Sequence, residues 1–497
     1  MEVSMSKLLP TRPNLEHLKT QARDLLTAVK NGQELDRIQA SFPNRNYLTL
    51  VEAQLVIARE YGFDSWPKLK AHIESISQGG TRQQQADELA RQLVQGTPAV
   101  AKSLALADPS LLGVSLACAC ATGSRQAVSD FLDLDPTLVE SKVGPNNWEP
   151  LLYVCNSRLL QVAEFSDRLV QTAKLILEAG ANPNVFWEDQ YRLSALYGAA
   201  GLNGNADLTE LLLQAGADPN DGESVYHSTE LDEPDCLGLL LQYGGNVEDA
   251  MYRLLDFEKP EWVELVLALT PDRSRIPPCI PHGLRRGRST ETFRILTESG
   301  MDLSRPDSRG KTPYQAAVRL GRLDVIEMLK AKGAVTDLSE VDTLLKKVLL
   351  GESITPEEIT PELLKALDEE PEPAVVMWSE RGYLGALETL LKLGANPNVA
   401  DHNGFTGLHQ AALAPSVEVA RLLLQYGADV TQEDYVHHGT PLGFASHVSA
   451  DTSHPQGYVY VVEELLKAGC PLPNSHNACP EVLVVLKAHG FVDKGRN

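Results

Sequence analysis

The chain has 497 residues, a formal net charge of −23 and 43% apolar residues. This length requires several domains or an elongated array, and the apolar content excludes general disorder. The negative charge disfavours non-specific binding to nucleic acid or to an anionic membrane, so we expect neither as a partner.

The first 80 residues carry no repeat and predict a small group of helices. Asn14 and Thr49 each precede a stretch with helical hydrophobic periodicity, and Ser65 opens a third such stretch. Residues 77–81, Ser-Gln-Gly-Gly-Thr, have the composition of a linker. We interpret residues 1–80 as a helical cap and linker, because the open apolar end of a repeat array needs a cover.

A short phrase recurs through the rest of the chain: a leucine-rich stretch followed by Gly-Ala-Asx-Pro-Asn. Clear copies end at Asn184, Asn220 and Asn398, and weaker copies lie between and beyond them. The leucines indicate the apolar face of a helix. The glycine suits the left-handed residue that ends a helix, and the proline prevents its continuation.

The spacing of these glycines predicts two kinds of repeat. Gly300 and Gly333 lie 33 residues apart, whereas Gly216 and Gly244 lie 28 apart. Both periods accommodate two helices, but only the longer one leaves room for a hairpin loop. We therefore expect the hairpin to be missing from about residue 221 to residue 300.

The residues after the phrase identify a family. Residues 401–412 read Asp-His-Asn-Gly-Phe-Thr-Gly-Leu-His-Gln-Ala-Ala, and related copies begin at Asp307 and Thr440. They resemble the ankyrin consensus, in which a turn precedes Thr-Pro-Leu-His and a helix of small residues. The ankyrin resemblance covers roughly residues 84–492. The N-terminal stretch before it resembles a short helical segment that often precedes the repeats in bacterial ankyrin proteins.

The resemblance implies an all-α fold, an ankyrin-type helical solenoid of about 11 to 12 degenerate repeats behind the N-terminal helical cap. The solenoid is expected over residues 81–497. Residues 337–383 are acidic and punctuated by proline, and we interpret them as a degenerate or interrupted repeat within the array. Residues 156–170 and 447–458 are expected to be longer connections between the two helices of a repeat.

The chain shows no motif of a known catalytic class. It has no phosphate-binding loop, nucleophile elbow, zinc-protease motif or dinucleotide fingerprint, so we lean towards a protein that is not an enzyme and needs no cofactor. Seven scattered cysteines favour a reducing compartment, and we expect a cytoplasmic protein without a signal peptide or membrane span. The late histidines lack the spacing of metal ligands, so no metal site is expected, and His409 and His227 are assigned to bonds with loop backbone.

Three groups of residues are candidates for binding a protein partner on the concave face that such an array presents. Aromatic residues gather in consecutive repeats, where they either form a binding patch or replace missing consensus residues in the packing. The aromatic candidates are Trp148, Tyr153, Trp187, Tyr191 and Tyr197. A second group lies in the hairpin that matches the consensus best, and it comprises Asp401, His402 and Phe405.

The third group is a run of arginines between Arg273 and Arg294. Its site candidates are Arg285, Arg286 and Arg288. Guanidinium groups bind carboxylate and phosphate in a bidentate manner, so the run indicates a possible anionic ligand. The alternative is a solvated face paired with nearby acids such as Glu258. The main hypothesis is a scaffold or regulator that binds a protein. The second is a groove for a small or anionic molecule, lined by these arginines and the aromatic residues.

Overall fold

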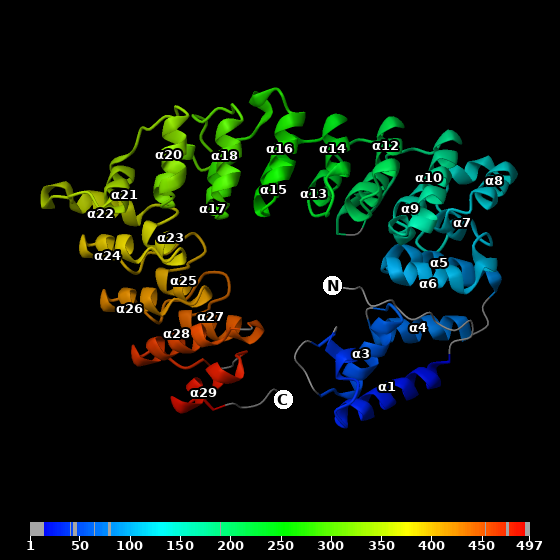
Figure 1. Ribbon diagram of the computed structural model, residues 1–497, viewed down its shortest axis with the longest axis horizontal. Helices are drawn as coiled ribbons and strands as arrows, with labels where there is room; N and C mark the ends of the chain where they lie inside the picture. The colour runs from blue at the N-terminus through cyan, green and yellow to red at the C-terminus, as the bar shows by residue number, and fades with distance from the viewer. Residues whose placement is uncertain are drawn as a thin grey trace. The chain divides into compact units, whose positions relative to one another are not determined.

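The computed structural model describes residues 14–39, 41–42, 47–63, 65–77, 81–188, 190–452, 454–473 and 477–492. Within them the chain consists of short helices joined by tight turns, which confirms the all-α prediction (Figure 1). The only sheet among the described residues is a two-stranded hairpin, β1 (Phe186–Glu188) with β2 (Arg192–Ser194). The chain forms two compact units, Met1–Arg275 and Ile276–Asn497.

The N-terminal helices begin where the sequence predicts. The Asn14 side chain accepts from the Glu16 N–H (2.8 Å), and Thr49 and Glu52 form a reciprocal capping box. The last of these helices packs against the first helix of the array. The helices are α1 (Leu15–Lys30), α2 (Leu35–Gln39), α3 (Leu50–Glu60) and α4 (Trp66–Ser77).

The rest of the first unit consists of helix pairs. First helices pack on first helices along the chain, and second helices pack on second helices, so two rows form. The pairs are α5 (Arg82–Gln95) with α6 (Pro98–Ala107), α7 (Leu116–Thr122) with α8 (Arg125–Leu134), α9 (Pro150–Cys155) with α10 (Ala163–Glu178), α11 (Ala195–Tyr197) with α12 (Ala206–Gln214), α13 (Ser224–Ser228) with α14 (Asp235–Gln242), and α15 (Val247–Asp256) with α16 (Pro260–Leu269).

The second unit continues the same design and ends in a single helix. Its pairs are α17 (Ile280–Arg285) with α18 (Thr290–Glu298), α19 (Pro313–Arg319) with α20 (Leu323–Ala331), α21 (Glu340–Leu350) with α22 (Pro361–Asp368), α23 (Ala374–Glu380) with α24 (Leu384–Lys392), α25 (Gly407–Leu413) with α26 (Val417–Gln425), and α27 (Pro441–Val448) with α28 (Gln456–Lys467), followed by α29 (Pro480–Ala488). The described residues thus contain twelve pairs from α5 to α28, in line with the predicted solenoid.

The recurring Gly-Ala-Asx-Pro-Asn phrase ends the helix before it, and its last asparagine contacts the neighbouring repeat. Gly216 has a φ of 95°, the left-handed conformation predicted for it. The Asn184 amide of the preceding copy donates to the Gly216 carbonyl (3.0 Å) and accepts from the Asp218 N–H (2.8 Å). Asn398 makes the same two contacts with the loop at Gly427. The final asparagine of the phrase therefore links one turn to the next, which its local sequence did not indicate.

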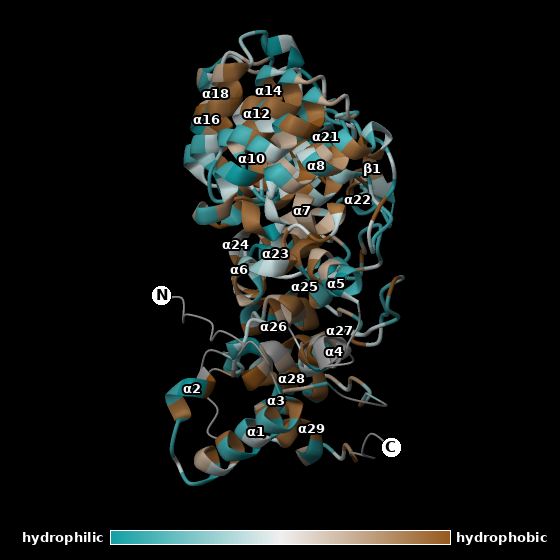
Figure 2. Cartoon of the chain, turned by 90° about the vertical axis from the view of Figure 1, so that its right-hand side faces the viewer, coloured by the Kyte–Doolittle hydropathy of each residue, from teal (hydrophilic) through white to brown (hydrophobic). Residues whose placement is uncertain are grey.

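The first helices are packed from small and apolar side chains. All seven cysteines are buried free thiols, and burial raises the pKa of Cys118 to about 12. They are packing residues in this environment, because a protonated buried thiol is a small apolar group. Figure 2 shows apolar residues along helices such as α12 and α14 and hydrophilic residues over many of the connecting loops.

The irregular stretches are more helical than expected. The predicted connection at 156–170 is the 3-10 helix η3 (Arg158–Gln161) and the start of α10. Residues 447–458 contain the end of α27, η7 (Ser449–Asp451) and the start of α28. No strand is found in residues 221–300, all of which are described. The interruption at 337–383 contains α21, η6 (Pro356–Glu358), α22 and α23.

Candidate partner-binding surface

Two of the aromatic candidates are core residues, which corrects the prediction for them. Tyr153 is fully buried, and its hydroxyl donates to the Val143 carbonyl and accepts from the Asn146 N–H, both at 2.9 Å. Burial raises the pKa of Tyr153 to about 12. Trp148 is also buried, with its ring 5.4 Å from that of Tyr153. The two rings pack together, and the Tyr153 hydroxyl holds the loop before α9 through its two hydrogen bonds.

The next repeat carries aromatic residues that do reach the surface. Trp187 lies in β1, half-buried, with its ring 5.0 Å from that of Trp148. The hairpin turn that follows presents Tyr191, which is 62% exposed. On β2, the Arg192 guanidinium lies over the Phe186 ring at 3.6 Å and stiffens the hairpin. We call residues 186–188 and 190–194 the hairpin finger.

A cleft lies beside the hairpin finger. Its volume is about 320 Å³, and it is lined by Pro183, Asn184, Phe186, Arg192, Ser194, Leu196, Asp218, Asn220 and Asp221. The Asp221 carboxylate accepts from the hydroxyls of Ser194 and Ser224 and from the Ser224 N–H, so its oxygens are occupied by the chain itself. The cleft thus combines an aromatic wall with polar groups that the fold has already satisfied.

Tyr197 lies on the row of first helices, at a place of close approach. It ends α11, which continues as a π-helix, η4 (Gly198–Leu202). A Cβ on Gly201 would lie 2.8 Å from the His227 Cβ and 3.0 Å from the Tyr197 ring, so glycine permits this packing. The Tyr197 and His227 rings meet edge to face at 5.3 Å. Single-turn π-helices of this kind are frequent at functional sites.

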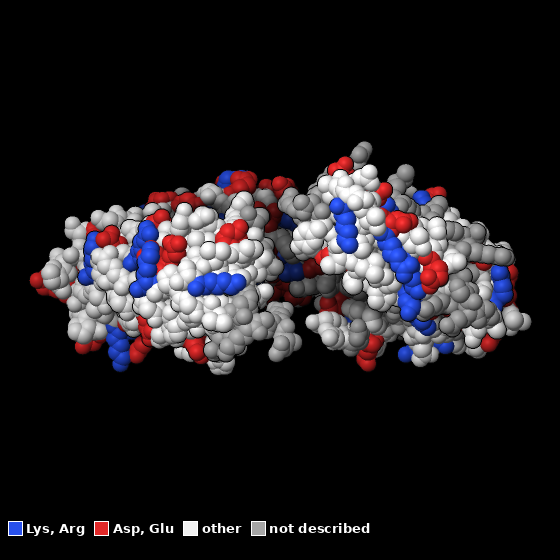
Figure 3. Space-filling model, turned by 90° about the horizontal axis from the view of Figure 1, so that it is seen from below, with Lys and Arg blue, Asp and Glu red and all other residues white. Residues whose placement is uncertain are grey.

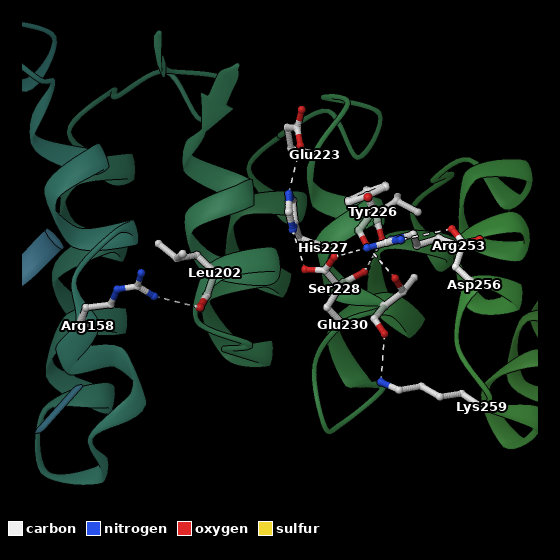
Figure 4. A network of polar contacts seen from close by, with 12 residues as sticks. Arg158, Leu202, Glu223, Tyr226, His227, Ser228, Glu230, Arg253, Asp256 and Lys259 are labelled. Atoms are coloured by element: carbon white, nitrogen blue, oxygen red, sulfur yellow. Dashed lines mark hydrogen bonds and ion pairs between the residues drawn. The ribbon is translucent and has the colours of Figure 1, made fainter. Parts of the chain in front are cut away.

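His227 does not bond loop backbone, which corrects the prediction made for it. Its two ring nitrogens lie 3.3 Å from Glu223 and 2.9 Å from Glu230, within a polar network across α13 and α15 (Figure 4). Arg253 pairs with Glu230 and with Asp256, and its guanidinium lies 4.1 Å from the centre of the Tyr226 ring. Burial alone would raise the pKa of Glu230, but Arg253 and His227 hold it below its ordinary value.

Arg158 is the exception to this pairing of charges. Its guanidinium makes one long hydrogen bond, from Nη1 to the Leu202 carbonyl (3.4 Å), and its Nε is buried without a partner. Among the described residues no carboxylate lies within ion-pair distance of it. Burial lowers the pKa of Arg158, and burial raises that of Tyr197 beside it, although the Arg158 charge opposes the latter shift. Sequence reasoning missed Arg158, because a single arginine after a helix gives no signal of its surroundings.

The arginine run is largely engaged by the chain's own groups. Arg285 pairs with Asp307 (2.7 Å), and Arg294 pairs with Glu291 and Glu298 (both 2.6 Å). The Arg288 guanidinium donates to the Arg286 carbonyl, and Arg273 donates to carbonyls at the end of α16. Arg273 belongs to the first compact unit and the others to the second. The solvated ion-pair interpretation therefore describes Arg294, whereas Arg285 lies in a more buried setting.

The predicted hairpin at 401–409 is a tight turn. The Asp401 carboxylate accepts from the N–H groups of Asn403 (2.9 Å) and Phe405 (3.0 Å), so this side chain shapes the loop. His402 is exposed at the tip. Phe405 is half-buried against Phe444, with ring centres 5.2 Å apart. Of the three candidates, only His402 is fully presented to a partner.

His409 has the loop-bonding role predicted for it. It is fully buried, its Nδ1 accepts from the Thr406 N–H (3.1 Å), and its Nε2 lies 3.0 Å from the Gly439 carbonyl. The neutral ring therefore carries its proton on Nε2. Burial lowers the pKa of His409 below its ordinary value of 6.5, because a desolvated site disfavours the charged ring.

This burial predicts a pH dependence of stability. Because the unfolded chain binds the proton more tightly, the stabilising contribution of His409 is complete above pH 6.5 and declines as the pH falls below that value. We expect the urea midpoint of the second unit to fall between about pH 7.5 and about pH 5.5 more in the wild type than in His409→Gln. Glutamine is the matched substitute for His409. At the start of α19 the Gln315 side chain accepts from the Thr312 N–H, as the His409 ring accepts from the Thr406 N–H. An equal shift of the urea midpoint in both proteins would contradict the assignment of this pH dependence to His409.

The described residues also bear on three other kinds of feature, a metal site, a membrane span and a nucleic-acid interface. In the described part of the chain, no group of three or more His, Cys, Asp or Glu side chains could hold a metal ion. None of the helices described is long and apolar enough to cross a membrane. On the face shown in Figure 3, basic and acidic side chains are interspersed without a continuous basic field. A continuous basic field is the usual footprint of a nucleic-acid interface.

Comparison with known proteins agrees with the repeat geometry. A family model for ankyrin repeats in three copies matches residues 357–475, and a model for a single ankyrin repeat matches residues 191–224. The chain is 28% identical over 157 residues to a putative palmitoyltransferase ZDHHC13 of Danio rerio, covering 31% of this chain and 20% of that protein.

Human proteins with ankyrin repeats are also similar to the chain. It is 38% identical over 74 residues to human ankyrin repeat and SOCS box protein 6, which is 15% of this chain and 18% of that protein. It is 37% identical over 98 residues to human ankyrin repeat and SOCS box protein 3, or 20% and 17%. The chain thus spans about a fifth of each relative. The helix pairs, the left-handed glycines and these matches together identify the chain as an ankyrin-repeat protein.

Proposed function

We propose that this protein is an interaction scaffold that binds a protein partner through the unit Met1–Arg275. The proposed surface consists of the hairpin finger, Tyr197 and Arg158. Arg158 is the observation that carries the proposal. It is a part-buried cation without a counter-ion among the described residues, in a chain with 67 acidic residues against 44 basic ones. A buried unpaired charge is costly, and a partner carboxylate would remove that cost.

The proposed surface contains the residue types of a binding hot spot. Tyrosine, tryptophan and arginine are the residues that most often dominate protein interfaces, and Tyr191 and Trp187 of the hairpin finger together with Arg158 of the preceding repeat supply all three. The Tyr197 hydroxyl has no hydrogen-bond partner among the described residues, so it can donate to the same carboxylate as Arg158. The polar network of His227, Glu230 and Arg253 adjoins this surface and offers a hydrated rim. The free thiols support the proposal of a cytoplasmic location, and the bacterial affiliation stays a prediction.

Site-directed photo-crosslinking in native lysate tests the proposal. A benzoylphenylalanine placed at position 191, on the hairpin finger, should give one dominant protein adduct. The matched control is position 243, where Tyr243 is 41% exposed at the end of the second-row helix α14. The adduct at position 191 should disappear when Arg158→Ala is introduced. A partner captured equally from both positions, or one captured regardless of Arg158, would contradict the proposed surface.

A further inference from the structure

An acidic segment in the interrupted repeat lies over a group of basic side chains. Residues 369–373 read Glu-Glu-Pro-Glu-Pro and connect α22 to α23 without forming a helix or a strand. We call them the acidic strap. All of the contacts described below lie within the unit Ile276–Asn497, so they do not depend on the surface proposed above.

The strap is held through two carboxylates. Glu370 pairs with Arg319 (2.6 Å) and lies 3.7 Å from Lys311. Glu372 pairs with Arg309 and lies 3.9 Å from Arg285. Four cations from α17, the turn before α19, and α19 itself thus converge on two acids. We call Arg285, Arg309, Lys311 and Arg319 the cationic site.

The framework builds the cationic site without the strap. Asp307, which is almost fully buried, pairs with Arg285 and accepts from the N–H groups of Arg309 and Lys311 at 3.0 Å each. Asp307 therefore fixes the turn that carries two of the cations. Two buried acids, Asp307 and Asp342, each engage one side of an arginine. They leave other N–H groups of these arginines directed at the strap, which is the arrangement of a pre-organised anion site.

The second buried acid is Asp342 on α21, whose side chain is 1% exposed. It lies 2.6 Å from the Arg319 guanidinium. Burial lowers the pKa of Arg309, and the nearby Arg285 lowers it further, as expected where like charges are concentrated. Burial alone would raise the pKa of Glu370, but Arg319 and Lys311 hold it below the ordinary value. The cationic site thus stabilises a carboxylate that would otherwise be disfavoured.

The two glutamates in the middle of the strap are attached through their side chains. No backbone hydrogen bond of Glu370 or Glu372 is found among the described residues, and Pro371 and Pro373 have no N–H to donate. Both glutamate side chains are 18% exposed, so the two carboxylates lie at the solvent edge of the cationic site. Because the contacts are made by carboxylate groups, another carboxylate in the same place can make them as well.

We propose that the cationic site binds an acidic, proline-containing peptide segment of a partner protein and that the acidic strap occupies this site as an intramolecular competitor. The strap shows the chemistry that the site accepts: two glutamates separated by one proline in an extended segment. An external peptide with the same spacing would meet the same four cations once the strap has left. Binding is then coupled to release of the segment between α22 and α23.

Fluorescence anisotropy with a labelled peptide of residues 367–374 tests the proposal on the full chain. The double substitution Glu370→Gln/Glu372→Gln should free the site and tighten peptide binding at least about tenfold over the wild type, because the competent fraction rises. The matched control is Glu357→Gln/Glu362→Gln, which removes two exposed charges from the same region, outside both the strap and the cationic site. It should bind like the wild type. Adding Arg309→Ala to the freed variant should abolish the gain.

Any of three results would overturn the proposal. One is a freed variant that binds no better than the matched control, and a second is equal binding of a peptide in which glutamine replaces every glutamate. Oligonucleotide binding to the freed variant in place of the peptide would also overturn it. If the freed variant fails to fold, hydrogen exchange in the wild type decides the question. Excess peptide should speed exchange of the hydrogen-bonded Glu369, Val376 and Met377 N–H groups at the two ends of the strap, and unchanged exchange would refute the proposal.

Discussion

Replacing Trp378 with alanine is expected to lower the unfolding free energy of the second unit by about 3–5 kcal/mol. Trp378 is fully buried in α23, and its Nε1 donates to the Arg319 carbonyl at the end of α19 (2.8 Å). The substitution removes the largest buried side chain at the point where the array resumes after the interrupted repeat, and it leaves a cavity there.

Hydrogen exchange of α19 and α23 is the appropriate measurement, because long repeat arrays do not unfold in one step. The control is Val484→Ala on α29, where the side chain is 68% exposed and a change within about 0.5 kcal/mol is expected. A loss below about 1 kcal/mol for Trp378→Ala would show that α23 does not depend on this contact.

Replacing Asp342 with alanine is expected to cost about 3 kcal/mol, at the low end for a broken buried ion pair. The substitution strands the Arg319 side chain, which is only 7% exposed, with Glu370 as its remaining acid. Denaturant unfolding followed by a probe in the second unit would measure the loss.

The double substitution Asp342→Ala/Arg319→Met provides the control for this prediction. Because much of the cost is the uncompensated arginine, removing both charges should recover a large part of the lost stability. The stability losses of Asp342→Ala and Arg319→Met are compared with the loss of the double variant. If the two single losses simply add, the Asp342–Arg319 ion pair contributes no stability as a pair, and the pre-organisation of the cationic site would lose its support.

The repeat architecture was predictable because its signals are local. A leucine face, a glycine in the left-handed region and a following proline each act within one turn, so Gly216 and its counterparts could be located from spacing alone. The same holds for His409, whose bonds lie within its own hairpin and the next one.

The candidate sites were harder to predict because they depend on contacts between distant residues. Arg285 was recognised as an anion-binding candidate, but its acids are Asp307 and, 87 residues away, Glu372. No local pattern encodes that pairing, since it depends on how the interrupted repeat returns to the row of first helices. Tyr153 was misassigned for a related reason: an aromatic side chain has the same apolar character in a core as on a binding face.

The affinity of the partner captured at position 191 for two charge variants tests the central claim most directly. Arg158→Ala removes the unpaired cation of the proposed surface, whereas Lys174→Ala removes one exposed positive charge from α10, the second-row helix of the same repeat. Measured by calorimetry, binding should weaken at least about tenfold for Arg158→Ala, a hot-spot loss above about 1.4 kcal/mol, and hardly change for Lys174→Ala. Equal affinities for both variants would contradict the claim that the partner binds at Arg158.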